Sequence, residues 1–512
     1  MDGATRLARM PTVAGSPNAF RARANPHLYE INTWAWLEKM SQQQKRQIQL
    51  GDVPDTVWDE IAARGFNIVW LMGVWRRSAE SRRQNIEDPR DFPKYSAALP
   101  GWTAADVISS PYAVTGYVPD ARIGPWESVD LVRKKLHARG MALYLDFVGN
   151  HTALDHPWTR EHPEYYVLGT QDEFERDPSL FFPVKNGSKT NLIARGKDPY
   201  FPPWRDVAQL NYFNPELRAA QITELKNIAS FCDGIRCDMA MLQITEIFER
   251  TWGWALRGAP TPAMEFWSEA HASVPELTLL AEAYWGTEPR LFDLGFSFAY
   301  DKVLYDEVRN ANASAVRERI TWMPEKQGAF ARFLENHDEE RRAEVFPNDR
   351  LQADGTLMGT LPGMRFYYQG ELEGRRISMP ITLRVAADEP VDPVSEKFFE
   401  LLLKITNEEV FHTGAFRVLQ VNAEGDAPPY GLIAYEWRSD SAWKMIVVNL
   451  ADATCQGRIP LAGHVEAEAE YVFWDQVNDV KYPRTGAELA SMGLFVRRDR
   501  FEAHLFDVAR VG

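Results

Sequence analysis

Eight short apolar runs, alternating with longer amphipathic stretches, restrict the fold of this sequence more than any other feature. The runs are 28–36, 67–74, 141–148, 234–239, 278–283, 296–300, 331–335 and 364–368. Helical periodicity separates most of them, as at 54–64, 125–139, 215–231, 301–320 and 393–406. Continuous apolar strands joined by helices are typical of a parallel sheet with both faces covered. Eight such units predict a closed (β/α)₈ TIM barrel. The open doubly wound alternative is disfavoured, because no glycine-rich phosphate fingerprint follows the first run.

Two interruptions and one change of period divide the chain further. Residues 152–210 separate the third run from its helix and are rich in Pro, Gly, Asp and aromatic residues, which indicates a small inserted subdomain. Residues 76–111 form a long loop after the second run. From about residue 411 the period becomes alternating, as in a small antiparallel β-sandwich. We therefore expect an N-terminal tail at 1–25, a barrel built from 26–151 and 211–410, the insert at 152–210, and the β-sandwich at 411–512.

Composition excludes several classes of partner. The formal net charge of the 512 residues is −15, and no basic cluster is present, which argues against nucleic acid. No apolar stretch reaches the roughly 18 residues of a membrane span, and the N-terminal segment lacks a signal-peptide core. Three cysteines are too few, and odd in number, for a disulfide framework. We expect a protein of the cytoplasm; its oligomeric state stays open.

Polar residues gather where four of the apolar runs end. Carboxyl ends of parallel barrel strands meet at one rim, so side chains from different runs converge there. An isolated acid at a strand end is usually a cap or a salt-bridge partner. Several buried like charges beside Arg and His are harder to explain in that way, and they are typical of functional sites. The residues are Asp146, Asn150 and His151; Arg236 and Asp238; Glu282; and Asn336, His337 and Asp338.

These four segments resemble the signature regions of the α-amylase family, glycoside hydrolase family 13. Residues 146–151 match D-x-x-x-N-H and 234–238 match G-x-R-x-D; Glu282 matches the strand-five acid, and 336–338 match N-H-D. The resemblance extends over the barrel, the insert and the C-terminal sandwich. It implies an enzyme, a glycosidase or transglycosylase, that acts on α-linked glucosides or oligosaccharides.

The resemblance also assigns roles to the three catalytic carboxylates. Asp238 would be the nucleophile that forms a covalent β-glycosyl intermediate. Glu282 would protonate the leaving oxygen and then activate the incoming water or sugar hydroxyl, which is the retaining route. Asp338 would bind sugar hydroxyls and stabilise the transition state.

Five further residues resemble the family's substrate-binding positions. Arg236 lies two residues before Asp238 on the same strand, so its charge would favour the ionised carboxylate. His151 and His337 would hydrogen-bond the sugar in the cleaved subsite, and Tyr112 would stack under it. Asp146 would support the site by orienting Arg236 or His151.

Three departures from the family pattern bear on substrate and metal. Met241 and Leu242 stand where many members have Lys-His on the leaving-group side, and Gln209 stands where Asp is frequent. With two long segments at the rim, these changes favour short α-glucosides over starch. Asn150 resembles a residue that holds calcium in many members; because we identify no other ligands, we expect no required cofactor and leave calcium as a possibility.

Alternatives remain at this stage. Hydrolysis and transfer share one intermediate, so the sequence does not separate them. A non-catalytic relative that binds sugar or a partner protein is the second reading, although such relatives lose acids that this chain keeps. A metal-dependent barrel enzyme is the third, and it would need a cluster of metal ligands that the sequence lacks.

Overall fold

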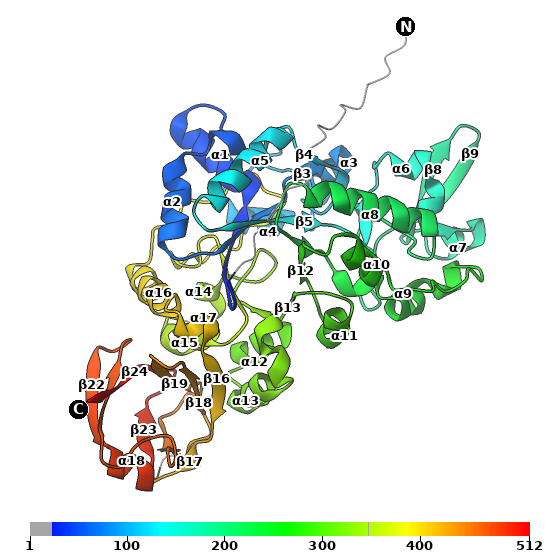
Figure 1. Ribbon diagram of the computed structural model, residues 1–512. Coiled ribbons are helices and arrows are strands. Elements are labelled where there is room, and N and C mark those ends of the chain that lie inside the picture. Colours follow the sequence, from blue (N-terminus) through cyan, green and yellow to red (C-terminus); the bar gives the residue numbers. More distant parts are fainter. Residues whose placement is uncertain (1–22, 347, 427, 512) are drawn as a thin grey trace.

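The computed structural model describes residues 23–346, 348–426 and 428–511. The N-terminal tail expected at 1–25 therefore lies outside the described residues, except for its last three. Eight parallel strands close into a barrel in the order β1-β2-β5-β11-β12-β13-β14-β15, with β15 pairing back to β1 (Figure 1). Their bounds are β1 His27–Asn32, β2 Ile68–Met72, β5 Ala142–Phe147, β11 Gly234–Cys237, β12 Thr278–Ala281, β13 Phe298–Tyr300, β14 Phe330–Arg332 and β15 Met364–Tyr368.

Each strand overlaps one of the eight apolar runs, and the predicted (β/α)₈ barrel is confirmed. Every residue of β1, β2, β5, β11 and β15 is buried, as expected for strands covered on both faces. The first run extends furthest beyond its strand. Its strand ends at Asn32, which caps helix α1 (Thr33–Gln44) by accepting a hydrogen bond from the Ala35 amide at 3.5 Å. The apolar residues after Asn32 therefore pack from a helix, a difference that a short apolar run cannot signal.

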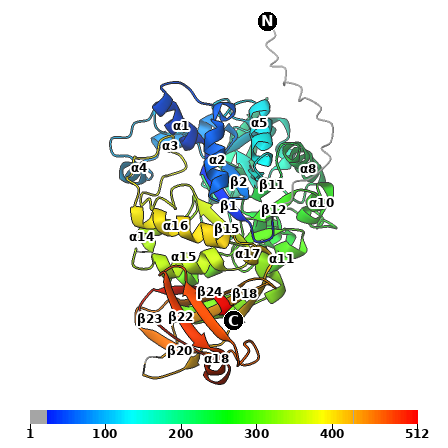
Figure 2. The same cartoon turned by 60° about the vertical axis from the view of Figure 1, so that its left-hand side comes forward.

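Helices cover the outside of the barrel (Figures 1 and 2). Besides α1, the longer ones are α2 (Asp55–Ala63), α5 (Trp126–His137), α8 (Pro215–Ala229), α9 (Thr245–Trp252), α10 (Phe266–Ser273), α12 (Lys302–Arg309), α13 (Ala313–Thr321), α15 (Leu351–Thr360) and α16 (Pro393–Thr406). Helix α8 illustrates how the sequence starts them. The Asn214 side chain accepts hydrogen bonds from two amides of the first turn, and Pro215 occupies the first helical position, where no amide donor is needed.

The insert projects from the barrel as a separate lobe, on the right of Figure 1. Its stem is the antiparallel pair β6 (His151–Ala153) and β10 (Val207–Gln209). Its body is a three-stranded sheet of β7 (Leu168–Gly169), β9 (Lys189–Ala194) and β8 (Phe181–Asn186), with the short helices α6 (Trp158–Glu161) and α7 (Gln171–Arg176). Because the stem begins at His151, the insert grows directly out of the rim where β5 ends.

The long connection after β2 also sits at this rim. It contains β3 (Trp75–Arg77), which pairs with β4 (Val114–Pro119), and helices α3 (Ala79–Glu87) and α4 (Phe92–Ala98). It is bonded to the insert: the Ser78 and Ser81 hydroxyls donate to Asp155 and Asp206 at 2.6 and 2.7 Å. Arg205 of the insert forms ion pairs with Asp88 and Asp91. The two segments therefore meet side by side at the rim, where the paired strands β2 and β5 end.

Antiparallel sheets form the C-terminal part of the chain, at the lower left of Figure 1. One sheet has the order β16-β18-β19-β24-β21-β22 and the other β17-β20-β23. The bounds are β16 Ala415–Leu419, β17 Asn422–Ala423, β18 Leu432–Arg438, β19 Trp443–Asn449, β20 Cys455–Ile459, β21 Glu470–Asp475, β22 Val480–Thr485, β23 Leu494–Arg498 and β24 Ala503–Val511. A buried apolar cluster that includes Met445, Ile459 and Phe473 lies between them. The antiparallel architecture agrees with the alternating sequence pattern.

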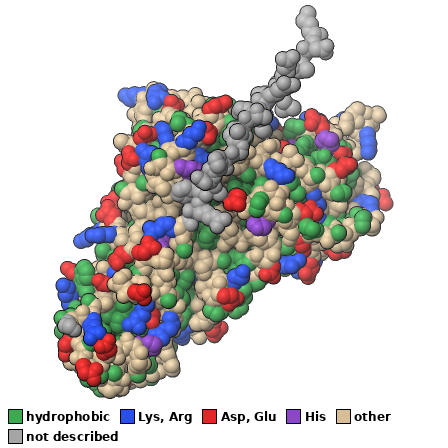
Figure 3. All heavy atoms as spheres, in the orientation of Figure 1, with side chains coloured by type: hydrophobic (Ala, Val, Ile, Leu, Met, Phe, Trp, Pro, Cys, Tyr) green, Lys and Arg blue, Asp and Glu red, His purple; other side chains and the backbone are tan. Residues whose placement is uncertain are grey.

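Surface charge and helix composition complete the description of the fold. On the face drawn in Figure 3, basic and acidic side chains are interspersed. Within the described ranges, no helix has both the length and the apolar character needed to cross a membrane.

Candidate active site at the carboxyl rim of the barrel

The three predicted carboxylates lie together around one guanidinium group. Arg236 points inward from β11 and is fully buried. Its Nη1 lies 2.7 Å from Asp238 Oδ1, and its Nη2 lies 2.8 Å from Glu282 Oε2 and 3.9 Å from Asp338 Oδ2. Nε donates to the Tyr300 hydroxyl at 3.3 Å. Asp238 follows β11, Glu282 follows β12 and Asp338 follows β14, so barrel closure brings them to the same rim.

Glu282 has the environment of a proton donor. Burial, together with the neighbouring carboxylates, raises the pKa of its carboxyl to about 7, although the Arg236 guanidinium acts in the opposite direction. The Met239 amide donates to Oε2 at 2.7 Å, and the Tyr284 hydroxyl donates to Oε1 at 2.8 Å. A carboxyl with such a pKa carries a proton up to about neutral pH, which suits a general acid.

Asp238 and Asp338 differ in their exposure and in the direction of their pKa shifts. Burial raises the pKa of Asp238, and the bonded Arg236 offsets part of that rise. Burial acts against the ionised form of Asp338 too, but the charge and hydrogen bond of His337 outweigh it and bring the pKa below its usual value. The Asp338 side chain is 42% exposed, against 7% for Asp238. Asp338 is therefore an ionised carboxylate that a ligand can reach.

His337 connects Asp338 to the first barrel strand. Its Nδ1 lies 2.5 Å from Glu30 Oε1, and its Nε2 lies 2.9 Å from Asp338 Oδ2. Burial lowers the pKa of His337, but these two carboxylates together raise it well above its usual value, so the ring is an imidazolium. Sequence reasoning did not include Glu30, although a charged residue inside the buried run 28–36 was a usable signal.

The predicted Tyr112 and His151 also face the site. The Tyr112 hydroxyl lies 2.8 Å from His337 Nε2, and its ring centroid lies 5.2 Å from the Arg236 guanidinium carbon. His151 Nε2 lies 3.9 Å from Asp238 Oδ2. Burial lowers the pKa of His151 to about 4, so this ring is neutral near pH 7. Trp204 of the insert, which sequence reasoning did not single out, packs against His151 with ring centroids 5.3 Å apart.

Asp146 does not have the partners expected for it. The prediction was that it orients Arg236 or His151. Instead, its Oδ1 accepts from the Trp70 indole at 3.0 Å and its Oδ2 from the Gly73 amide at 2.7 Å. Its carboxylate thus fastens the end of β2 to β5. Gly73, at φ 78°, takes a conformation in which only glycine is unstrained, and this turns its amide toward Asp146.

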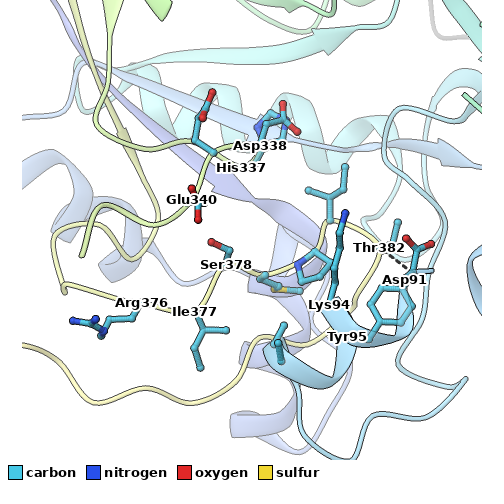
Figure 4. A pocket seen from close by; sticks show the side chains of 16 residues that line it. Asp91, Lys94, Tyr95, His337, Asp338, Glu340, Arg376, Ile377, Ser378 and Thr382 are labelled. Atoms are coloured by element: carbon cyan, nitrogen blue, oxygen red, sulfur yellow. Dashed lines mark hydrogen bonds and ion pairs between the residues drawn. The ribbon is translucent and has the colours of Figure 1, made fainter. Parts of the chain in front are cut away.

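A cavity of about 710 Å³ opens beside Asp338 and His337 (Figure 4). One wall is α4, from which Lys94 and Tyr95 contribute, and the other is the segment 376–382 that follows β15. The Tyr95 and Thr382 hydroxyls are 3.0 Å apart and join the two walls. The space accommodates a ligand of a few sugar rings that reaches Asp338.

The surroundings of Asn150 do not fit a calcium ion. The Gln209 side-chain amide donates to the Asn150 backbone and side-chain oxygens, both at 3.0 Å, and to the Leu210 carbonyl at 3.1 Å. Three oxygens that could face a cation therefore face an N–H₂ donor, and Gln209 is fully buried. Over the part of the chain that the structure describes, no group of three or more His, Cys, Asp or Glu residues could hold a metal. Calcium prefers six to eight oxygens, which this arrangement does not offer.

Comparison with known proteins shows the family. The family model described as "Alpha amylase, catalytic domain" matches residues 112–390, more than half of the chain. The chain belongs to the α-amylase family. It is 26% identical over 297 residues to "Alpha-amylase 3" of Dictyoglomus thermophilum, covering 52% of this chain and 54% of that protein. It is 21% identical over 373 residues to "Oligo-1,6-glucosidase" of Parageobacillus thermoglucosidasius, covering 63% of this chain and 61% of that protein. The chain thus spans little more than half the length of these curated relatives.

Solved structures share the fold over nearly the whole chain. A maltogenic α-amylase from Thermotoga neapolitana superposes with a TM-score of 0.65 at 17% identity, covering 94% of this chain and 98% of the other. The α-amylase of Geobacillus thermoleovorans, solved with acarbose, superposes with a TM-score of 0.63 at 19% identity, covering 96% of this chain and 99% of the other. At such identities the likeness establishes a common architecture of barrel and antiparallel sheets.

The donor set around Asn150 generates a prediction about metal dependence. Chelation with EDTA or addition of millimolar calcium should shift the melting temperature of the wild-type protein by less than about 1 °C. Gln209→Glu, an isosteric change, should lower it by several degrees, because an ionised carboxylate would face three oxygens and each lost hydrogen bond costs about 1–3 kcal/mol. Calcium should recover part of the loss in the variant. Thermal unfolding followed by circular dichroism measures these melting temperatures. A wild-type protein that calcium strongly stabilises would contradict the conclusion that the surroundings of Asn150 do not fit a calcium ion.

Proposed function

We propose that this protein is a retaining glycosidase or transglycosylase that acts on α-linked glucosides. The observation that carries the proposal is that Arg236 holds Asp238 and Glu282 on neighbouring nitrogens of one buried guanidinium. Retaining enzymes need two carboxyl groups roughly 5 Å apart, whereas inverting enzymes need room for a water between them. The printed names of the relatives, α-amylase and oligo-1,6-glucosidase, support α-glucans or α-glucosides as substrates.

In the first step, Asp238 attacks the anomeric carbon and the bond to the leaving sugar oxygen breaks. Arg236 binds Oδ1 of Asp238, which leaves Oδ2 available to form the new bond. Glu282 gives its proton to the leaving oxygen. In the second step, Glu282 takes a proton from water or from a sugar hydroxyl, whose oxygen attacks the same carbon and displaces Asp238. Two displacements on one carbon retain its configuration.

The remaining residues bind the sugar and stabilise charge. Asp338 is ionised and exposed, so it can accept hydrogen bonds from sugar hydroxyls and stabilise the positive charge that develops at the anomeric centre. The His337 imidazolium keeps it ionised. The Tyr112 ring, backed by Arg236, offers an aromatic face to the sugar in this subsite.

Substrate size follows from the segments at the rim. The connection after β2 is bonded to the insert through Ser78, Ser81 and Arg205, and α4 is joined to the segment after β15. A cleft walled along one side in this way would admit the end of a chain more readily than its middle. We therefore propose short soluble α-glucosides as preferred substrates. Hydrolysis and transfer follow the same first step, and both remain within the proposal.

We also propose a reducing compartment such as the cytoplasm. Its support is that Cys232, Cys237 and Cys455 are all buried and free.

A non-catalytic sugar-binding role is the alternative function. The proton-donor environment of Glu282 argues against it, because binding a sugar does not require a carboxyl that stays protonated to about neutral pH.

Product stereochemistry tests the nucleophile. The reducing end first released from maltotriose should be the α anomer, because the reaction inverts the carbon twice. Proton NMR during the first minutes, before mutarotation, measures it. Asp238→Asn should keep the melting temperature within a few degrees and lose turnover by at least about 1,000-fold, since an amide cannot form the intermediate. A β product would rule out the covalent route.

The pKa of Glu282 sets the alkaline limb of activity. Glu282 donates its proton below its pKa and loses that proton as the pH rises, so kcat/KM for maltotriose should fall above about pH 7. Glu282→Gln should lower this kcat/KM by about 100-fold or more. It should lower release of fluoride from α-glucosyl fluoride much less, because fluoride leaves without a proton. Glu318→Gln, an exposed glutamate on α13, is the control. Equal losses on both substrates would exclude Glu282 as the acid.

Chain length tests the closed cleft. The kcat/KM for maltotriose should exceed that for soluble starch by about tenfold at equal concentrations of cleavable ends. Arg205→Ala removes the ion pairs with Asp88 and Asp91 and should reduce this ratio, while turnover of α-glucosyl fluoride stays unchanged. A preference for starch with random internal cuts would disprove the closed cleft and leave the family unaffected.

A further inference from the structure

A second, smaller cavity lies on the outer face of the barrel, against strand β1. Its volume is about 160 Å³, room for roughly five water molecules at about 30 Å³ each. Its walls are α1, α2, β1 and the segment after β15 (Figures 1 and 2). Tyr29 and Ile31 of β1 line it, whereas Glu30 between them binds His337 inside the barrel. Strand β1 therefore separates this cavity from the candidate active site.

Aromatic side chains give this cavity flat apolar surfaces. Tyr29 and Phe66 are 7% and 3% exposed, with ring centroids 4.8 Å apart and planes tilted by 36°. Trp36 of α1 is half-buried, and Trp58 of α2 packs edge-on against it with ring centroids 5.5 Å apart. Contacts with neighbouring rings thus hold the aromatic side chains in place. A ligand with an apolar face can cover such surfaces, whereas water gains nothing from them.

Several polar groups that line the cavity have no hydrogen-bond partner within the described ranges. They are the Tyr29 hydroxyl, the Gln369 side-chain amide and the Glu60 carboxylate. The hydroxyl of a tyrosine as buried as Tyr29 usually finds a partner, because an unpaired buried donor costs free energy. Each such group in a folded protein requires an explanation, and a bound molecule with hydroxyl groups supplies one.

The charges in the lining restrict the class of ligand. Arg64 Nη1 lies 3.2 Å from Glu373 Oε1, and Glu60 adds a second carboxylate. Burial, and next the Glu373 carboxylate, raise the pKa of Tyr29, so its hydroxyl keeps its proton and can donate. Two carboxylates against one guanidinium disfavour an anion such as a phosphate ester. Sugar hydroxyls suit the set, because each can donate to a carboxylate and accept from Tyr29 or Gln369.

We propose that this cavity binds one pyranose ring of a neutral monosaccharide, with D-glucose as its simplest representative. A pyranose has an apolar C–H face for the aromatic rings and hydroxyls around its edge for Tyr29, Gln369 and Glu60. The cavity is far smaller than the 710 Å³ space beside Asp338, so it takes a single ring and not a chain. The site goes beyond the proposed function and does not rest on it, because strand β1 lies between the two.

The test needs a signal that reports on this cavity and not on the active site. In the full chain labelled with 5-fluorotryptophan, the ¹⁹F NMR signal of Trp36 is the one that Trp36→Phe removes. D-Glucose should shift this signal saturably, with a dissociation constant of roughly 1–10 mM, as expected for a ligand with few atoms. Sorbitol has the hydroxyls but no ring to place on the aromatic surfaces, so it should bind at least about tenfold more weakly.

Variants of the lining should weaken this binding. Tyr29→Phe and Gln369→Ala should each raise the dissociation constant of D-glucose about threefold to tenfold, because each removes one hydrogen bond. Val57→Phe, on the α2 wall, fills the cavity and should abolish the shift of the Trp36 signal. Tyr144→Phe is the matched control. It also removes the hydroxyl of a buried tyrosine, but Tyr144 lies on β5 and does not line the cavity, so the constant should stay the same.

Three outcomes would overturn the proposal. With no saturable shift of the Trp36 signal up to about 100 mM D-glucose, tenfold above the expected range, the cavity would hold water only. An unchanged dissociation constant in Tyr29→Phe and Gln369→Ala would place the binding elsewhere. Equal binding of sorbitol would show that no ring is recognised. If Tyr29→Phe fails to fold, the half-buried Gln369→Ala decides the question. Turnover of maltotriose tests the proposed function separately, whichever of these results is found.

Discussion

The guanidinium of Arg236 is the group on which the geometry of the rim depends. A fully buried cation must be paired, and its neighbours on the rim are Asp238, Glu282 and, at longer range, Asp338. Removing one partner of a buried pair costs about 3–5 kcal/mol, so the two buried carboxylates, Asp238 and Glu282, cannot move away freely. Strand β11 carries Arg236 and ends directly before Asp238, and β12 pairs with it in register. The separation of the two carboxyls is therefore set by the barrel itself and not by mobile loops.

Charges of alternating sign extend this arrangement around the mouth of the barrel. Glu30 of β1 faces the His337 imidazolium, which faces Asp338, which in turn lies near Arg236. In a buried network each charge stabilises its neighbours more strongly than it would in water. The same network separates the titration of the carboxyls: Glu282 has a pKa raised to about 7, while that of Asp338 is lowered. One rim thus provides a protonated and an ionised carboxyl at the same pH, which the proposed chemistry requires.

The insert contributes both rigidity and shape to this rim. Gln209 joins the stem of the insert to Asn150 by amide hydrogen bonds, in a position where the family resemblance suggested a metal ligand. Arg205 and Asp155 tie the same lobe to the connection after β2. The walls of the site are consequently held by hydrogen bonds and ion pairs within the described chain. These contacts fix the side of the cleft near Asp338.

The sequence by itself determined the barrel and the identity of the principal carboxylates. Periodicity reports which strands are buried, and parallel strands present their carboxyl ends together, so Asp238, Glu282 and Asp338 could be placed at one rim before any coordinates. Their roles were implied only by the resemblance of their motifs to those of the family. Tertiary structure alone decided which side chains meet. Glu30 binds a histidine 307 residues away, Asp146 binds Trp70 and Gly73 in place of Arg236, and Met241 and Leu242 are buried. Such contacts depend on barrel closure and loop packing between distant segments, and a local pattern of residues carries no record of either.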